Sequence, residues 1–138
     1  MQTLTTLIDA FGVDVHDHLD RDELVPTSAG LQFQGDVAVI PTDTLPISGT
    51  AVPPAGVPVV RGENGGNTHL LLALGDNVTW LPARRLAATA LDLGHLTVPA
   101  GTTAYLAHPE HGYLGIAPGA YTIRRQREQA DVVRLVAD

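Results

Sequence analysis

The sequence predicts a mainly β, single-domain protein: a small β-barrel or sandwich with a short N-terminal helix and a possible C-terminal helix. Three observations predict this class. The chain has 138 residues, the length of one ordinary domain. Its glycines and prolines fall mostly beyond residue 25 and separate short apolar runs. Tight-turn signals, such as those at residues 99–101 and 118–119, join these runs, which is typical of small barrels and sandwiches.

Residues 1–30 are predicted to form a helical extension. The apolar residues at its start follow helical spacing: Leu4, Leu7, Ile8 and Phe11. Gly12 is expected to end this helix, because glycine adopts the left-handed conformation common there. The acidic stretch that follows, "DVHDHLDRDEL", is compatible with a second short helix that turns Leu19 and Leu24 inward, or with a loop.

Residues 31–138 are predicted to form the β-barrel or sandwich domain. Alternating or continuously apolar runs mark its strands within 31–43, 57–62, 67–75, 77–82, 91–101, 103–108 and 120–128. Two segments favour a helix instead. Residues 83–91 contain good helix formers, and residues 127–138 place apolar side chains at roughly helical spacing.

Composition restricts the chemistry. The chain has no cysteine, which excludes a disulfide scaffold, a thiolate zinc site and a cysteine nucleophile. Any metal ion would therefore be held by nitrogen and oxygen ligands. The net charge of −7 makes nucleic acid an unlikely partner, because phosphate binding needs basic residues.

The sequence also argues against a membrane partner. It has no run of about eighteen consecutive apolar residues. Its first twenty residues lack the basic start and long apolar run of a secretory signal. We therefore expect a cytoplasmic protein.

The strongest candidate site is the stretch "AHPEH". If the chain turns there, His108 and His111 point to the same side, with Glu110 between them. A third ligand is expected from His69, where a glycine-rich loop enters an apolar strand. The sequence thus predicts a divalent metal site (zinc, iron or manganese) at these three histidines, with Glu110 as general base. Glu63 is a further carboxylate candidate. The alternative is that the histidines only hydrogen-bond to the backbone and hold loops in place.

The remaining histidines and acids have simpler interpretations. His16 and His18 lie among aspartates and are assigned to a solvated acidic surface. His95 is expected to face outward from a strand. Asp36 follows Gly35 and is interpreted as part of a turn that enters a buried strand, not as a catalytic acid.

The one basic cluster is "RRQRE" at residues 124–128. On a strand, Arg125 and Arg127 would share one face and Arg124 the other. The favoured interpretation is a solvent face paired with some of the chain's acids.

Several elements together resemble a family of short bacterial and phage-borne proteins of unknown function. They are "QGDV", the glycine loop that ends at His69, "HPEH", and "PGAY" followed by "RQRE". The resemblance covers residues 33–138 and points to His69, His108, Glu110 and His111. Family members tend to carry a further histidine where this chain has Asn67, which removes one possible ligand. The resemblance implies a shared site but no reaction.

Two functions are therefore open. One is a binding or assembly module that associates with itself or with another protein and has a possible histidine-rich metal site. The alternative is a metal-dependent, cupin-like enzyme that uses His69, His108 and His111 with Glu110 as general base.

Overall fold

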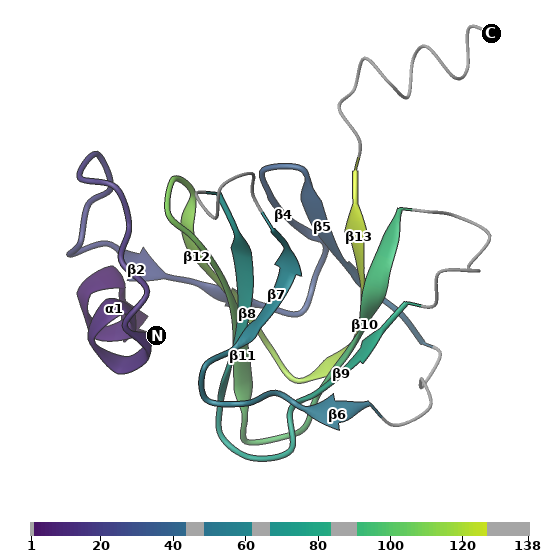
Figure 1. Ribbon diagram of the computed structural model, residues 1–138. Helices are drawn as coiled ribbons and strands as arrows, with labels where there is room; N and C mark the ends of the chain where they lie inside the picture. The colour runs from purple at the N-terminus through teal and green to yellow at the C-terminus, as the bar shows by residue number, and fades with distance from the viewer. Residues whose placement is uncertain (1, 44–48, 62–66, 84–90, 127–138) are drawn as a thin grey trace, which may run out of the picture.

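The computed structural model describes residues 2–43, 49–61, 67–83 and 91–126 (Figure 1). It contains one helix, α1 (Leu4–Phe11). Its strands are β1 (Gln2–Thr3), β2 (Leu24–Val25), β3 (Thr27–Ser28), β4 (Gln32–Gln34), β5 (Val37–Pro41), β6 (Thr50–Ala51), β7 (Val57–Val60), β8 (His69–Leu74), β9 (Thr79–Pro82), β10 (Asp92–Val98), β11 (Thr103–His108), β12 (Gly112–Ile116) and β13 (Gly119–Arg125). The mainly β prediction is confirmed.

The N-terminal helix begins and ends where the sequence predicts. The side chain of Thr3 accepts a hydrogen bond from the backbone N–H of Thr6, which caps the first turn. Gly12 ends the helix in the left-handed conformation, with φ 76°, and its N–H donates to the carbonyl of Ile8. The acidic stretch after it forms turns and the short strand β2, so the second helix considered for this stretch does not form.

Two larger sheets enclose the main core. One has the strand order β4-β5-β13-β10-β9-β6, and the other β3-β12-β11-β8-β7. Val37 and Leu96 of the six-stranded sheet belong to the same buried cluster as Leu71 and Leu106 of the five-stranded sheet. Among the described residues no sheet closes into a barrel. The arrangement is compatible with a sandwich.

The five-stranded sheet is covered on both faces, which explains its long apolar run "HLLLAL". Leu71 faces the main core, whereas the next residue, Leu72, joins a second cluster with Tyr105 and the helix residues Leu4 and Leu7. A small sheet of β1 and β2 completes the N-terminal layer. The N-terminal extension therefore packs onto the outer face of the sheet.

The chain passes from the five-stranded to the six-stranded sheet between β12 and β13. The hydroxyl of Tyr121 donates a 2.6 Å hydrogen bond to the carbonyl of Ala117, four residues earlier. The ring of Tyr121 is buried in the main core. This bond and this burial fix the corner from which β13 starts.

Two predicted helices cannot be compared with the fold. The candidate at 83–91 falls largely on residues 84–90, and the C-terminal candidate on 127–138, and both lie outside the described residues. Within the described ranges, no helix is long and apolar enough to cross a membrane.

The shared second cluster makes a prediction about stability. Leu7 is 1% exposed, so Leu7→Ala should lower the free energy of unfolding by about 2–4 kcal/mol. The control Asp9→Ala changes an exposed residue of the same helix and should have little effect. Chemical denaturation followed by the fluorescence of Trp80, which lies in the main core, should shift with Leu7→Ala. An unchanged Trp80 transition would contradict shared packing of extension and sheets.

Candidate functional site

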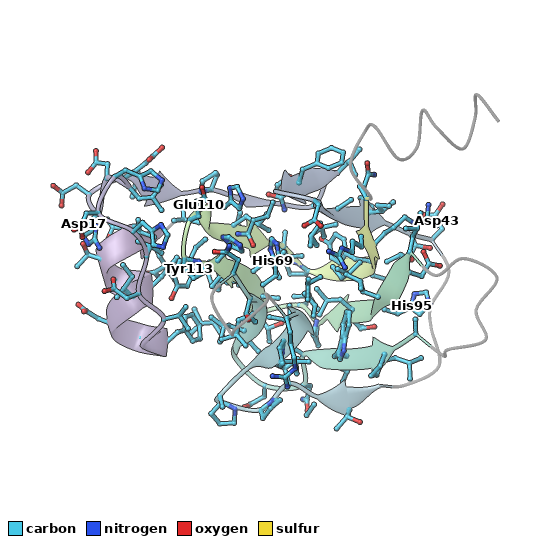
Figure 2. All side chains as sticks on the ribbon, turned by 45° about the horizontal axis from the view of Figure 1, so that its top comes forward. Asp17, Asp43, His69, His95, Glu110 and Tyr113 are labelled. Carbon is cyan, nitrogen blue, oxygen red and sulfur yellow. The ribbon has the colours of Figure 1, made fainter. Side chains whose placement is uncertain are left out.

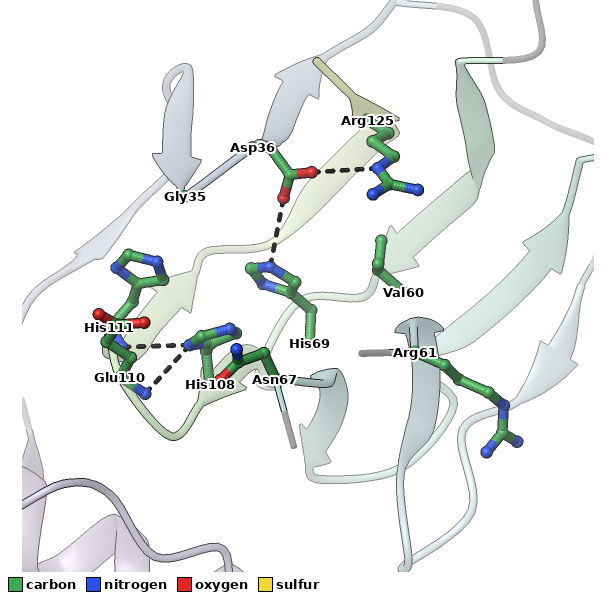
Figure 3. Close-up of a pocket in the computed structure, with 10 residues that line it drawn as sticks. All are labelled: Gly35, Asp36, Val60, Arg61, Asn67, His69, His108, Glu110, His111 and Arg125. Carbon is green, nitrogen blue, oxygen red and sulfur yellow. Dashed lines mark hydrogen bonds and ion pairs between the residues drawn. The ribbon is translucent and has the colours of Figure 1, made fainter. Parts of the chain in front are cut away.

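A polar pocket of about 280 Å³ is lined by residues from the ends of strands of both large sheets and from the turns beside them. Figure 3 shows these lining residues. Its lining residues come from β7, β8, β11 and β13, from positions close to the ends of β7 and β8, and from the turns beside β5 and β12: Gly35, Asp36, Val60, Arg61, Asn67, His69, His108, Glu110, His111 and Arg125. The three histidines and the glutamate of the predicted site thus line one pocket.

His69 and His108 meet because of strand register. β11 pairs antiparallel with β8 up to Ala107 opposite Leu70, and the same register puts His108 beside His69. Alternation places His69 on the face of Leu71, toward the space between the sheets. The two rings lie 4.3 Å apart between centroids, and each residue is only 3% exposed.

His111 lies in the turn between β11 and β12 and is exposed. Its ring centroid is 4.5 Å from that of His108 and 6.4 Å from that of His69. Gly35 makes room for this ring. Its φ of +58° favours glycine, and a Cβ there would lie 2.9 Å from Nε2 of His111. Among the described residues, no group hydrogen-bonds to the ring nitrogens of His111.

Gln34 determines which nitrogen of His69 carries a proton. Its amide nitrogen donates both protons, to the carbonyls of Leu106 (2.8 Å) and Gly112 (3.1 Å). Its amide oxygen is therefore an acceptor and lies 2.9 Å from Nδ1 of His69. Nδ1 must donate, so the neutral ring presents a lone pair at Nε2.

The Nε2 atom of His69 faces a carboxylate. Oδ1 of Asp36 lies 3.5 Å from it, and the other carboxylate oxygen, Oδ2, accepts a 3.0 Å hydrogen bond from Nε of Arg125 (Figure 3). When His69 is neutral, two acceptor atoms face each other across this gap, with no proton between them.

His69 is neutral near pH 7. Burial, together with the nearby His108 and His111, lowers its pKa to about 4, against the opposing effect of the Asp36 carboxylate. Burial also lowers the pKa of His108, with a further contribution from His111. His69 and His108 therefore present neutral imidazoles, the form that binds metal ions.

His108 is already committed to the backbone. Its Nδ1 accepts hydrogen bonds from the N–H groups of Glu110 (3.1 Å) and His111 (3.2 Å), and its ring also hydrogen-bonds to the backbone of Asn67. As the side chains lie, no group of three or more histidine, aspartate or glutamate side chains in the described ranges is ready to hold a metal ion. The predicted histidines come together, but His108 would have to break these bonds to become a ligand.

The other predicted positions vary in their relation to the pocket. Glu110 and Asn67 line it, and the side chain of Glu110 is exposed to solvent. Glu63 lies outside the described residues. His95 lies on β10, apart from His69 and Glu110 (Figure 2), and its Nδ1 is 3.3 Å from the hydroxyl of Thr122.

Sequence reasoning missed Gln34 and the role of Asp36. Asp36 lies in the two-residue turn between β4 and β5, where Gln34 pairs with Val37. It was expected to belong to a turn, which is correct, but it also points into the pocket. The sequence held one signal for this contact. "QGDV" contains Asp36, "RQRE" contains Arg125, and both are elements of the family resemblance. In the structure an ion pair connects the two residues.

The arginine pair of β13 agrees with the predicted faces. Arg125 pairs with Asp36, whereas Nε of Arg124 contacts Asp92 at 2.7 Å on β10. Arg127 lies outside the described residues.

The comparison with protein families assigns the domain. Residues 33–126 match the family described as "Domain of unknown function (DUF8820)", so the chain belongs to that family. This agrees with the resemblance to an uncharacterised family. No curated protein matches the chain. No solved structure matches it either.

The lowered pKa of His69 predicts a pH-dependent stability. Below pH 6.5 the unfolded state takes up a proton that folded His69 does not take up until about pH 4. The free energy of unfolding of the metal-free protein should therefore fall between pH 6.5 and 4, by on the order of 2–3 kcal/mol from this residue.

Denaturant titrations in a chelator over this pH range measure the effect. His69→Asn serves as the comparison, because its amide can still donate to Gln34 but does not titrate. The pH dependence should be shallower in this variant, and equal slopes in both proteins would contradict the assignment to His69.

Proposed function

We propose that this domain is a divalent-metal-binding module. Nε2 of His69 and Oδ1 of Asp36 are the first two ligands, and His111 is the third. One geometric observation carries the proposal: Nε2 of His69 lies 3.5 Å from Oδ1 of Asp36, while the contact with Gln34 assigns the ring proton to Nδ1. A cation in this gap would satisfy both acceptors.

The distance supports this assignment. Zinc binds imidazole nitrogen and carboxylate oxygen at about 2.1 Å, so two ligand atoms on one tetrahedral ion are about 3.4 Å apart. The gap between Nε2 of His69 and Oδ1 of Asp36 is close to that separation.

The side chains of His69 and Asp36 are also oriented by hydrogen bonds at the atoms that would not bind the ion. Metal-binding histidines usually donate their other ring N–H to an acceptor, and ligating carboxylates are usually hydrogen-bonded. Here Nδ1 of His69 donates to Gln34, and Oδ2 of Asp36 accepts from Arg125. Because these partners fix both side chains, an ion would bind without much rearrangement on this side.

His111 is the best third ligand. It is exposed, its ring lies over Gly35, and a rotation of its side chain brings no loss of a ring hydrogen bond to the described residues. In this proposal His108 holds the turn, and the ligand set differs from the three histidines predicted from the sequence: it consists of two histidines and an aspartate. Two imidazoles and one carboxylate suit zinc, iron(II) or manganese.

The charge of the pocket indicates what an ion would attract. Among the described residues, its lining has two carboxylates, Asp36 and Glu110, and two guanidinium groups, Arg61 and Arg125. These formal charges cancel, so a divalent ion would leave the pocket at about +2, and a small anionic ligand is favoured at the open coordination positions. Glu110 keeps the enzymatic alternative open, because its carboxylate lines the pocket and could act as base on a metal-bound water.

Metal binding is tested by titrating the chelator-treated protein with zinc and with cobalt(II). Calorimetry gives the stoichiometry, and the visible cobalt spectrum reports the ligand geometry. One ion should bind per chain. Asp36→Asn and His111→Ala should each weaken binding at least tenfold, because each removes one ligand.

Two control variants separate the ligands from nearby residues. His95→Ala removes a histidine far from the pocket, and Glu110→Gln changes a lining residue that is not a ligand. Both should bind like the parent protein. Absence of stoichiometric binding in the parent, or unchanged binding in Asp36→Asn, would overturn the proposal.

Self-association is a second candidate function, supported by an apolar edge. β4 is an outermost strand of the six-stranded sheet, and Phe33 on this strand is 56% exposed. Leu31, directly before β4, is 57% exposed. Exposed apolar side chains on an edge strand favour pairing with a second copy. A cytoplasmic location stays a prediction, and so does the lack of nucleic-acid binding, which the net charge of −7 supports.

Light scattering coupled to size-exclusion chromatography tests this candidate. The protein should elute as a dimer, and Phe33→Glu should shift it to the monomer because a charge replaces the apolar contact. Leu74→Glu, which changes an exposed leucine on another sheet, is the control and should leave the dimer intact. A monomeric parent protein would exclude self-association through β4.

A further inference from the structure

The turn that carries His111 is held from outside by the N-terminal extension. The backbone N–H of His16 donates to the carbonyl of Pro109 at 2.7 Å. Nε2 of His18 lies 3.1 Å from the carbonyl of Glu110, so this nitrogen carries the proton and donates. Two consecutive carbonyls of the turn, directly before His111, are thus bound by residues about ninety positions away.

The segment that makes these contacts is itself anchored. Val15 is buried in the second cluster, and the hydroxyl of Tyr113 donates to the carbonyl of Val13 at 2.7 Å. Nη2 of Arg21 donates to the carbonyl of Val15 at 2.9 Å and closes the loop. His16 and His18 therefore extend from a fixed segment and not from a free chain end.

The same turn is held from inside by His108. The N–H of Glu110 and that of His111 both point to Nδ1 of His108. The peptide groups around Glu110 are thus bound on both sides: His108 accepts from the N–H groups, and His18 donates to the carbonyl. This arrangement fixes the backbone from which the His111 side chain extends.

We propose that His18 is a positioning residue for the metal site, so that the N-terminal extension raises the affinity of the pocket for its ion. This inference rests on the proposed function, since it concerns the third ligand, His111. A ligand on a preformed turn binds more tightly than one on a mobile turn, because the ordering cost has already been met. His18 is not a ligand, since its Nε2 is used by the Glu110 carbonyl.

The exposure of His18 makes the effect measurable apart from folding. Its side chain lies at the surface, so its removal should leave the melting temperature nearly unchanged. Its hydrogen bond to Glu110 should instead appear in ion affinity. The loss of one hydrogen bond predicts an affinity about fivefold lower.

Three variants of the full chain test the inference. His18→Ala removes the donor and should weaken zinc binding about fivefold in competition with a chromophoric chelator. His18→Gln places an amide N–H near the position of Nε2 and should restore most of the affinity. His16→Ala is the matched control, because the contact of His16 with Pro109 uses the backbone N–H, and it should bind like the parent protein.

Hydrogen exchange of the metal-free protein provides a second measurement. In His18→Ala the amides of Glu110 and His111 should exchange faster than in the parent, and in His18→Gln they should be slow again. Faster exchange together with lower affinity is the expected result.

The outcomes separate the two proposals. If the parent protein binds zinc and His18→Ala binds it equally well, the role of His18 is overturned while the metal site stands. An equal loss in His16→Ala and His18→Ala also overturns it, because the effect would not depend on the His18 donor. If the parent protein binds no zinc, the proposed function fails, and the positioning role fails with it.

Discussion

The buried amide of Gln34 is the interaction on which the pocket depends. It extends from β4 of the six-stranded sheet and donates to the carbonyls of Leu106 and Gly112 in the five-stranded sheet. A buried amide without these partners would carry a large desolvation cost, so the two sheets are held together at this end. The same amide selects the tautomer of His69. One side chain thus connects the packing of the sheets to the chemistry of the pocket.

The five-stranded sheet lies between the main core and the N-terminal extension. Its inner face contributes Leu71 and Leu106 to the main core, and its outer face contributes Leu72 and Tyr105 to the cluster with the helix. β11 ends at His108 and leads into the turn that the extension contacts. Because the matched family region begins at residue 33, the residues that hold this turn from outside precede that region.

The sequence predicted those parts of the structure that depend on neighbouring residues alone. Helical spacing and Gly12 predicted the N-terminal helix, and the pair His108 and His111 predicted a turn with both rings on one side. The sequence predicted that His69 lies near His108, but it did not reveal the reason, which is the register between β8 and β11. Apart from the two family elements that contain Asp36 and Arg125, nothing in the sequence indicated the part played by Asp36, because it requires the pairing of β5 with a strand about eighty residues later. Local pattern carries no information on such pairing.

The corner at Tyr121 has a consequence for how the length of this chain can change. Tyr121, Ile123 and Arg125 share one face of β13, so the residue that anchors the corner and the residue that reaches the pocket are separated by an even number of positions. An insertion of one residue between them would turn the guanidinium to the opposite face, whereas an insertion of two would keep its direction and lengthen the strand. The number of residues between Tyr121 and Arg125 is therefore constrained in two ways: it sets the reach of the strand, and their separation must stay even.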